Sequence, residues 1–180
     1  MPSPGELQLI EDIIAESTAA LAELATLAAE GGITEAQFIM LMREEIKSTY
    51  IQQYLIVNGS TNMSQSDWGT LGSLIKEQYK YLDGFAGEIG NLTEAQIKAR
   101  MDMYINSSRS ANAAAMQNLE QANGASMMRW VLGETEDHCE DCLGYVNQGW
   151  VTIGELPLPG DGESQCLTNC KCSVEFGTGE

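Results

Sequence analysis

Five cysteines lie in the last quarter of this 180-residue chain, and none occurs before Cys139. They form two groups, Cys139-Glu-Asp-Cys142 and Cys166-Leu-Thr-Asn-Cys170-Lys-Cys172. A small glycine-rich segment with little apolar core usually needs a metal ion or a covalent crosslink to fold. Two closely spaced cysteine groups, separated by a hairpin-like stretch, supply four thiolates to one tetrahedral zinc ion. The spacing therefore predicts a metal-stapled module near the C-terminus.

Cys139 and Cys142 are the most secure ligands of the predicted site. A C-x-x-C pair also occurs in redox centres, but those require a thioredoxin-like βαβ context, which the sequence does not indicate. The second group offers three sulfurs for two positions. We predict a structural zinc site formed by Cys139, Cys142, Cys166 and Cys170. Cys172 either replaces one of these ligands or is buried as a small hydrophobic side chain.

The choice between zinc and disulfides depends on the compartment in which the chain is made. The N-terminus lacks the positively charged and apolar regions of a secretory signal peptide, and no apolar run of about 18 residues occurs. We therefore expect a chain made in a reducing cytosol, with no membrane span, where thiols bind metal rather than pair. An odd number of cysteines also cannot all pair within one chain. Disulfides remain the alternative, because oxidation after release from the cell would convert some of these thiols.

The chain is strongly acidic, with 26 acidic and 9 basic residues and a net charge of −17. Contacts to nucleic-acid phosphates require Lys and Arg, so this charge argues against nucleic-acid binding. From Gly133 onward the only Lys or Arg is Lys171. A basic protein surface or a bound cation is the better partner for such a field. The alternative is that the acidity serves only to keep the protein in solution.

The sequence gives no indication of an enzyme. Catalytic zinc sites keep an open position, whereas closed, thiolate-rich sites are structural. His138, the only histidine, lies beside Cys139 in an acidic run, and we expect it to face solvent. The Pro159-Gly-Asp-Gly162 stretch is not a phosphate-binding loop, because no Gly-Lys-Ser/Thr follows it. We therefore predict no catalytic residues.

Helical patterns occupy the chain before the cysteines. Thr34-Glu-Ala-Gln37 and Thr93-Glu-Ala-Gln96 are capping boxes, which begin helices. Glycines interrupt the third segment, so we expect a bend there or two shorter helices. Small residues in the fourth segment permit a close approach of another backbone, either within the chain or at a subunit interface. The predicted segments run from about Glu6 to Glu30, Thr34 to Val57, Ser64 to Ile89 and Thr93 to Ala122.

The C-terminal part favours short strands. We predict strands over Met127–Leu132, Gly149–Ile153 and Cys172–Phe176, and an extended segment that turns over Leu156–Gly162. The aromatic residues Trp130, Trp150 and Phe176 are expected to form a small core beneath the metal. The predicted fold is mainly α, a helical bundle or extended helical hairpins in a body spanning 1–124. A small, irregular, zinc-ribbon-like β module stapled by cysteines follows over 125–180.

The second half of the chain resembles a known protein family. The residues that carry this resemblance are Arg100-Met-Asp-Met-Tyr104-Ile-Asn-Ser-Ser-Arg109, Arg129-Trp130, Cys139-x-x-Cys142, Gly149-Trp150, Leu156-Pro157-x-Pro159-Gly160-Asp-Gly162 and Cys166-x-x-Asn169-Cys170-Lys-Cys172. In this arrangement the chain resembles the minor head, or head-morphogenesis, proteins of tailed double-stranded DNA bacteriophages. Many members carry His-Pro-Asn-Cys-Arg-Cys where this chain has Cys166 to Cys172, so the third ligand is the point at which it departs from them.

The resemblance implies a virion structural protein, made in the cytoplasm of the host bacterium. Its expected role is in head assembly or at the portal vertex, in contact with the portal protein, the major capsid protein or both, and as an oligomer in the virion. One alternative with the same chemistry is a capsid decoration or cement protein. A zinc-dependent nucleic-acid-binding protein is a further alternative, which the negative charge disfavours.

Overall fold

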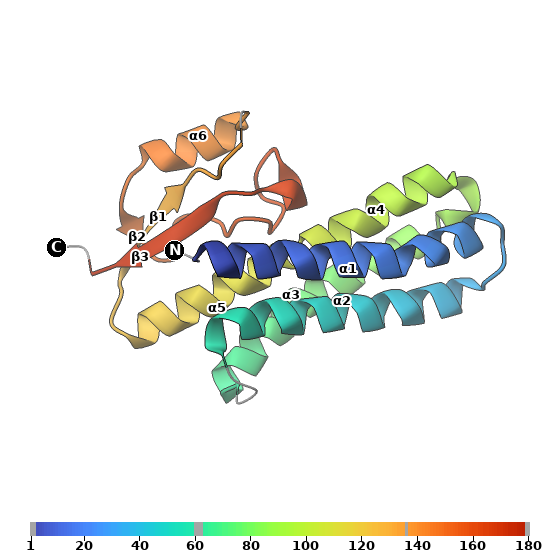
Figure 1. Cartoon of the computed structure of the whole chain (residues 1–180), viewed down its shortest axis with the longest axis horizontal. Coiled ribbons are helices and arrows are strands. Elements are labelled where there is room, and N and C mark those ends of the chain that lie inside the picture. The colour runs from blue at the N-terminus through green and yellow to red at the C-terminus, as the bar shows by residue number, and fades with distance from the viewer. Residues whose placement is uncertain (1–2, 60–62, 136, 179–180) are drawn as a thin grey trace.

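The computed structural model describes residues 3–59, 63–135 and 137–178 of the chain. Residues 1 and 2, at the start of the segment considered above for a signal peptide, lie outside these ranges. The helical part packs as a bundle of elongated helices lying lengthwise beside one another (Figure 1). Its helices are α1 (Pro4–Ala29), α2 (Glu35–Asn58), α3 (Gln65–Ala86), α4 (Glu94–Asn106) and α5 (Arg109–Ala122), with a 3₁₀ turn η1 (Ile89–Asn91) before α4.

A small module follows at one end of the bundle, beside α5 and the start of α1 (Figure 1). It contains β1 (Met127–Val131), α6 (Glu140–Asn147), β2 (Val151–Thr152), the 3₁₀ turn η2 (Leu167–Asn169) and β3 (Ser173–Gly177). The strands form an antiparallel sheet in the order β2-β1-β3, in which Met128 pairs with Val151 on one side and Phe176 on the other. The predicted fold class, a mainly helical chain with a small C-terminal β module, is confirmed.

Side chains fix where the helices begin. Thr34 accepts a hydrogen bond from the backbone N–H of Gln37, whose side chain accepts one from the backbone of Thr34. Thr93 and Gln96 do the same at α4, so both predicted capping boxes are present. Each box satisfies amide groups that the first turn of a helix leaves unpaired. The predicted segments Thr34 to Val57 and Thr93 to Ala122 therefore begin and end close to observed helix ends, apart from the break described below.

The third helical segment, for which we expected a bend or two shorter helices, is one continuous helix, so the alternative of two helices is wrong and the bend stays a prediction. Gly69 and Gly72 lie in exposed turns of α3, and nothing within 4 Å would meet a side chain at either position. Leu71, Leu82 and Phe85 lie on α3 as well, and their side chains are buried in the core of the bundle. Helices in proteins draw most of their stability from such an apolar face, and here that face outweighs the low helix propensity of glycine.

The fourth segment, predicted as one helix, is broken between α4 and α5 at Ser107 and Ser108. The side chain of Ser107 donates to the Tyr104 carbonyl and that of Ser108 to the Ile105 carbonyl. The backbone N–H groups of Ser108 and Ser110 bond three residues back rather than four. Serine hydroxyls compete in this way with the regular helical bonds, and the chain tightens into a short 3₁₀-type turn. The small residues around the break are buried within the chain, where α5 packs on α2.

Two hydrophobic clusters fill the molecule. The larger one is built from the inner faces of the bundle helices. The smaller one lies inside the module and includes Met128, Trp130, Leu156 and Val174, together with Ala113 from α5. Leu158 packs against both clusters and so links them. The boundary between 124 and 125 remains a prediction.

Trp130 is buried in the module, where its ring lies 4.9 Å from that of Tyr145. Phe176 is half-buried against the same cluster. Trp150 was expected to join this core, but it is 42% exposed and the guanidinium of Arg129 lies over its ring. The Trp150 ring lies beside Arg129 and Gly177, and Arg129 points to the face of β1 opposite that of buried Trp130.

Within the described ranges, no helix combines the length and the apolar character that crossing a bilayer requires.

Candidate metal centre

The first cysteine pair sits at the start of a helix that the sequence did not reveal. The stretch between the two cysteine groups was expected to be hairpin-like, but it begins with α6. Cys139 is the N-cap residue of α6, and its Sγ accepts a hydrogen bond from the backbone N–H of Cys142 at 3.5 Å. Glu140 and Asp141 occupy the first turn, where acidic side chains interact favourably with the helix dipole. The helical turn therefore places both thiols of the C-x-x-C at one end of α6.

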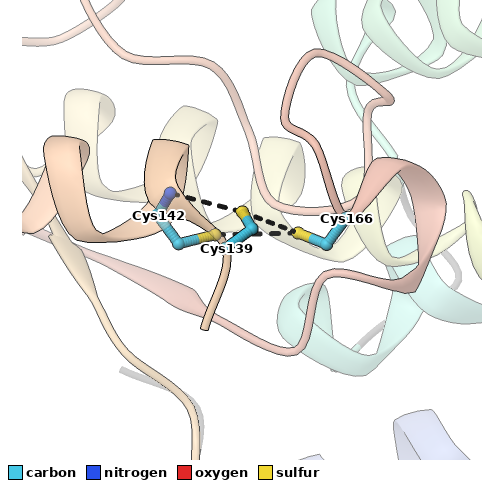
Figure 2. Close-up of side chains that lie close together, drawn as sticks. All are labelled: Cys139, Cys142 and Cys166. Carbon is cyan, nitrogen blue, oxygen red and sulfur yellow. Dashed lines mark hydrogen bonds between the residues drawn. The ribbon is translucent and has the colours of Figure 1, made fainter. Parts of the chain in front are cut away.

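The second cysteine group lies against this helix end. The Sγ of Cys166 is 3.6 Å from the Sγ of Cys139 and 3.6 Å from that of Cys142. Figure 2 shows these three side chains pointing toward one another, the first two from the start of α6 and the third from the loop before η2. Cys142 also lies 3.7 Å, sulfur to sulfur, from Cys170. Cys166 and Cys170 of the predicted ligand set thus both lie within 3.7 Å of Cys142, sulfur to sulfur, whereas Cys170 is not grouped with Cys139 and Cys166.

By their separations in space, rather than by their order in the sequence, the five sulfurs form two triplets that share Cys142. Cys139, Cys142 and Cys166 form the first, and Cys142, Cys170 and Cys172 form the second. Within each group the sulfurs lie within 4.8 Å of one another, a separation that a single metal ion can bridge. Cys172 is half-buried beside Cys142 and Cys170, so it is a neighbour of the centre rather than a fully buried core residue. Which four of the five would bind the ion remains a prediction.

The sulfur separations are those of free thiols and are compatible with a metal centre. A disulfide bond joins its sulfurs at about 2.05 Å, whereas all five cysteines here are free. Tetrahedral zinc binds thiolates at about 2.3 Å, which places any two of its sulfur ligands about 3.8 Å apart. The observed separations of 3.6, 3.6 and 3.7 Å are close to that tetrahedral edge. The cysteine cluster is therefore compatible with a structural metal ion.

The electrostatics of the cluster explain why a cation would stabilise it. Burial, together with hydrogen bonds from neighbouring thiols, raises the pKa of Cys142 well above its ordinary value. A hydrogen bond with Cys172, followed by burial, raises that of Cys170. The same contact with Cys170 is the main cause that lowers the pKa of Cys172, to about 5. Thiols this close share protons rather than ionise independently, and a bound cation is what allows several of them to be thiolates at once.

Neighbouring side chains hold the second group in place, and sequence reasoning missed them. The carboxylate of Asp141, inside the C-x-x-C, accepts a hydrogen bond from the backbone N–H of Gln165 at 2.8 Å. This contact fastens the loop that carries Cys166 to the first turn of α6. The hydroxyl of Ser164 lies 3.1 Å from the Sγ of Cys166. Such outer contacts orient metal ligands, and the only signal for them in the sequence was their closeness to the cysteines.

Gly133 allows the two cysteine-bearing segments to meet. A Cβ atom at this position would lie 2.2 Å from the carbonyl oxygen of Lys171 and 3.4 Å from the backbone nitrogen of Cys172. No side chain fits there unless the backbone of the second cysteine group moves. Gly133 thus sets the distance between the end of β1 and the segment carrying Cys170 and Cys172.

His138, expected to face solvent, is half-buried, and its Nδ1 lies 3.4 Å from the hydroxyl of Thr135. Among the described residues, the groups able to hold a metal ion contain cysteines alone, and His138 is in neither.

Comparison of the chain with protein-family models, with curated proteins and with solved structures found no match.

Proposed function

We propose that the cysteine cluster binds one structural zinc ion through Cys139, Cys142, Cys166 and Cys170. The observation that supports this most directly is three sulfur separations near the edge of a zinc–thiolate tetrahedron, Cys139–Cys166, Cys142–Cys166 and Cys142–Cys170. We take Cys170 rather than Cys172 as the fourth ligand, because its sulfur lies 3.7 Å from that of Cys142 and Cys170 is buried, whereas Cys172 is half-buried. Bound zinc would neutralise the buried thiolates and fix the start of α6 to the segment before β3. Its role would be structural, and we propose no catalytic function for the chain.

Elemental analysis of protein purified without chelator, paired with counting of free thiols after denaturation, tests this proposal. The expected result is one zinc ion per chain and five free thiols. Metal-free protein with five free thiols would contradict the zinc site. Metal-free protein with three thiols or one would instead favour disulfides formed from the same cysteines.

For the whole chain we propose a structural role in a bacteriophage virion, as a minor head protein acting in head assembly or at the portal vertex. The resemblance of the C-terminal cysteine block to head-morphogenesis proteins is what supports this role. A bundle carrying a stapled module and a net charge of −17 suits docking onto basic surfaces, which we propose belong to the portal protein, the major capsid protein or both. Oligomerisation in the particle belongs to the same proposal.

The position and copy number of the chain in purified particles test the virion role. A few copies per particle, located near the portal, is the expected result. Hundreds of copies spread over the capsid would instead indicate a decoration or cement protein. Absence from particles and from assembly intermediates would contradict both. Retention of DNA at low salt would contradict the electrostatic argument and favour the nucleic-acid-binding alternative.

A further inference from the structure

An open groove of about 610 Å³ lies between the helical bundle and the cysteine module. Residues from α3 and α4 line one side of it, and the segment from Asp161 to Thr168 lines the other. Three large apolar side chains on its walls are exposed: Tyr81 at 61%, Met103 at 38% and Leu167 at 45%. These three come from α3, α4 and η2, so separate parts of the chain bring exposed apolar surface to one place.

Leu167 is held in a strained backbone conformation at the edge of this groove. Its φ of +51° is the only positive φ of a non-glycine residue in the described ranges. A branched side chain is disfavoured in this left-handed region. The side chain of Leu167 is exposed, so packing in the core does not compensate for this backbone strain. The flanking cysteines Cys166 and Cys170 hold the turn, so the sulfur cluster keeps an apolar side chain pointing out of the module at a cost in backbone energy.

The groove also carries negative charge that the chain does not neutralise. Asp161 accepts hydrogen bonds from the backbone N–H groups of Leu158 and Glu163, but neither Asp161 nor Glu163 forms an ion pair with any described residue. Arg100, the basic residue in the lining, is already paired with Glu88 and lies over the ring of Phe85. The exposed carboxylate of Glu163 is therefore available to a cation, and the charge of Asp161 lies close to it in the same loop.

We propose that this groove docks a segment of a partner protein in which basic side chains alternate with apolar ones. The basic groups would lie against Asp161 and Glu163, and the apolar ones against Tyr81, Met103 and Leu167. A second copy of this chain fits this groove less well, since it has only 9 Lys and Arg residues against 26 Asp and Glu to offer to these acids. The proposal rests on the docking function proposed above only for the identity of the partner. The groove and its chemistry stand without it.

Binding of designed peptides to the intact, metal-replete chain tests the groove. The probes are three fluorescein-labelled nine-residue peptides that alternate leucine with lysine, with serine or with glutamate. Fluorescence anisotropy should show binding of the lysine peptide, weaker binding of the serine peptide and none of the glutamate peptide. Because an acidic protein attracts basic peptides anywhere on its surface, the comparison that decides is made between variants at physiological salt.

Leu167→Gly is the sharpest variant, because glycine accepts a positive φ without strain and the chain should fold at least as well as the parent. It should weaken binding of the lysine peptide roughly tenfold, as expected for losing one buried leucine contact. Glu163→Gln should also weaken it. The matched controls are Leu143→Ala, an exposed leucine on α6, and Glu44→Gln, an exposed acid on α2; both should bind like the parent.

Equal affinity of Leu167→Gly, Glu163→Gln and the two controls would show that the peptide binds elsewhere and would overturn the proposal. That outcome leaves the virion role intact, since presence in particles is measured separately. Conversely, groove binding by a protein that is absent from particles would retain the docking site and remove the phage assignment.

Discussion

The guanidinium of Arg109 donates two hydrogen bonds to the carboxylate of Glu11. Nη1 lies 2.6 Å from Oε1 and Nη2 lies 2.9 Å from Oε2, so the start of α5 is fastened to α1. The Arg109 side chain is only 11% exposed. Gly160 from the module packs on it, since a Cβ there would lie 3.1 Å from the Cβ of Arg109. Lys171, in the second cysteine group, reaches the same carboxylate at 3.9 Å. The Arg109–Glu11 pair therefore joins two helices of the bundle, and the module contacts it through Gly160 and Lys171.

Arg109→Ala should lower the free energy of unfolding by roughly 1–3 kcal/mol, because two charge-assisted hydrogen bonds and the packing under Gly160 are lost together. Lys80→Ala is the control, since Lys80 pairs with Glu77 on the exposed face of α3 and should change stability much less than Arg109→Ala. Urea unfolding followed by circular dichroism measures both. A similar small effect for the two variants would show that the Arg109 pair contributes no more than a surface ion pair.

The same pair predicts a pH dependence. Hydrogen bonds from Arg109 lower the pKa of Glu11 below its usual 4.5 in the folded chain, although partial burial opposes this. A carboxyl group with a depressed folded pKa contributes stability that is fully present above its unfolded pKa and is lost as the pH falls through its folded pKa. The stability difference between the parent and Glu11→Gln should therefore be constant from pH 7 to about pH 5 and shrink below pH 4.5. Urea unfolding at a series of pH values measures it, and a difference that does not change with pH would contradict the prediction.

Serine substitutions test which of the five cysteines bind the zinc ion. Cys142→Ser should abolish zinc retention, because Cys142 belongs to both sulfur groups. Cys139→Ser should do so as well and loosen the module, while the bundle keeps its far-ultraviolet helical signal. Cys172→Ser should retain one zinc ion per chain, since it lies outside the proposed ligand set. Elemental analysis after gel filtration measures each variant. Loss of zinc from Cys172→Ser, with retention in Cys170→Ser, would exchange those two residues in the assignment.

Gly133→Ala should disrupt the module, because its Cβ would overlap the Lys171 carbonyl at 2.2 Å. We expect a loss of about 1–3 kcal/mol and weaker zinc retention, as overpacking against backbone moves the cysteine segment. Gly144→Ala is the control: it lies inside α6 with nothing within 4 Å, so alanine should raise stability by up to about 1 kcal/mol. Thermal unfolding of the two variants should move in opposite directions, and a neutral Gly133→Ala would refute this close approach.

A buried hydroxyl pair stabilises the break between α4 and α5. The hydroxyl oxygens of Tyr50 and Ser107 are 2.7 Å apart and both residues are buried. Ser107→Ala leaves the tyrosine hydroxyl without this partner and should cost about 1–3 kcal/mol. The double variant Tyr50→Phe/Ser107→Ala should cost less than the sum of the two single ones, because neither group is then left unpaired. Additive losses in urea unfolding would show that the two hydroxyls act independently.

Local chemistry in the sequence was enough to locate most of the fold. The two Thr-x-x-Gln boxes gave helix starts, since capping depends only on residues three positions apart. The strand predictions around Trp130 and Val174 were confirmed, with ends shifted by a residue or two. The convergence of the two cysteine groups followed from their spacing alone.

What the sequence did not predict depends on distant residues or on short elements. The eight-residue helix α6 is too short to show a clear apolar period, and its signal was only the acidic pair after Cys139. The role of Gly133 depends on the Lys171 carbonyl, which lies far along the chain and leaves no local pattern. The continuity of α3 through its glycines depends on burial of Leu71 and Leu82 by other helices. Local propensity gives way to tertiary packing at each of these places.

The order of strands in the module has a consequence for synthesis of the chain. β1 is the central strand, but both of its partners are made after it, and β3 ends only at Gly177. Until β3 has been made, Met127 to Val131 has one open edge and Trp130 lacks its neighbour Val174. Unpaired apolar strands of this kind associate readily with other chains. The module therefore closes only after β3 has left the ribosome, and a chain truncated before β3 is expected to aggregate rather than to fold partially.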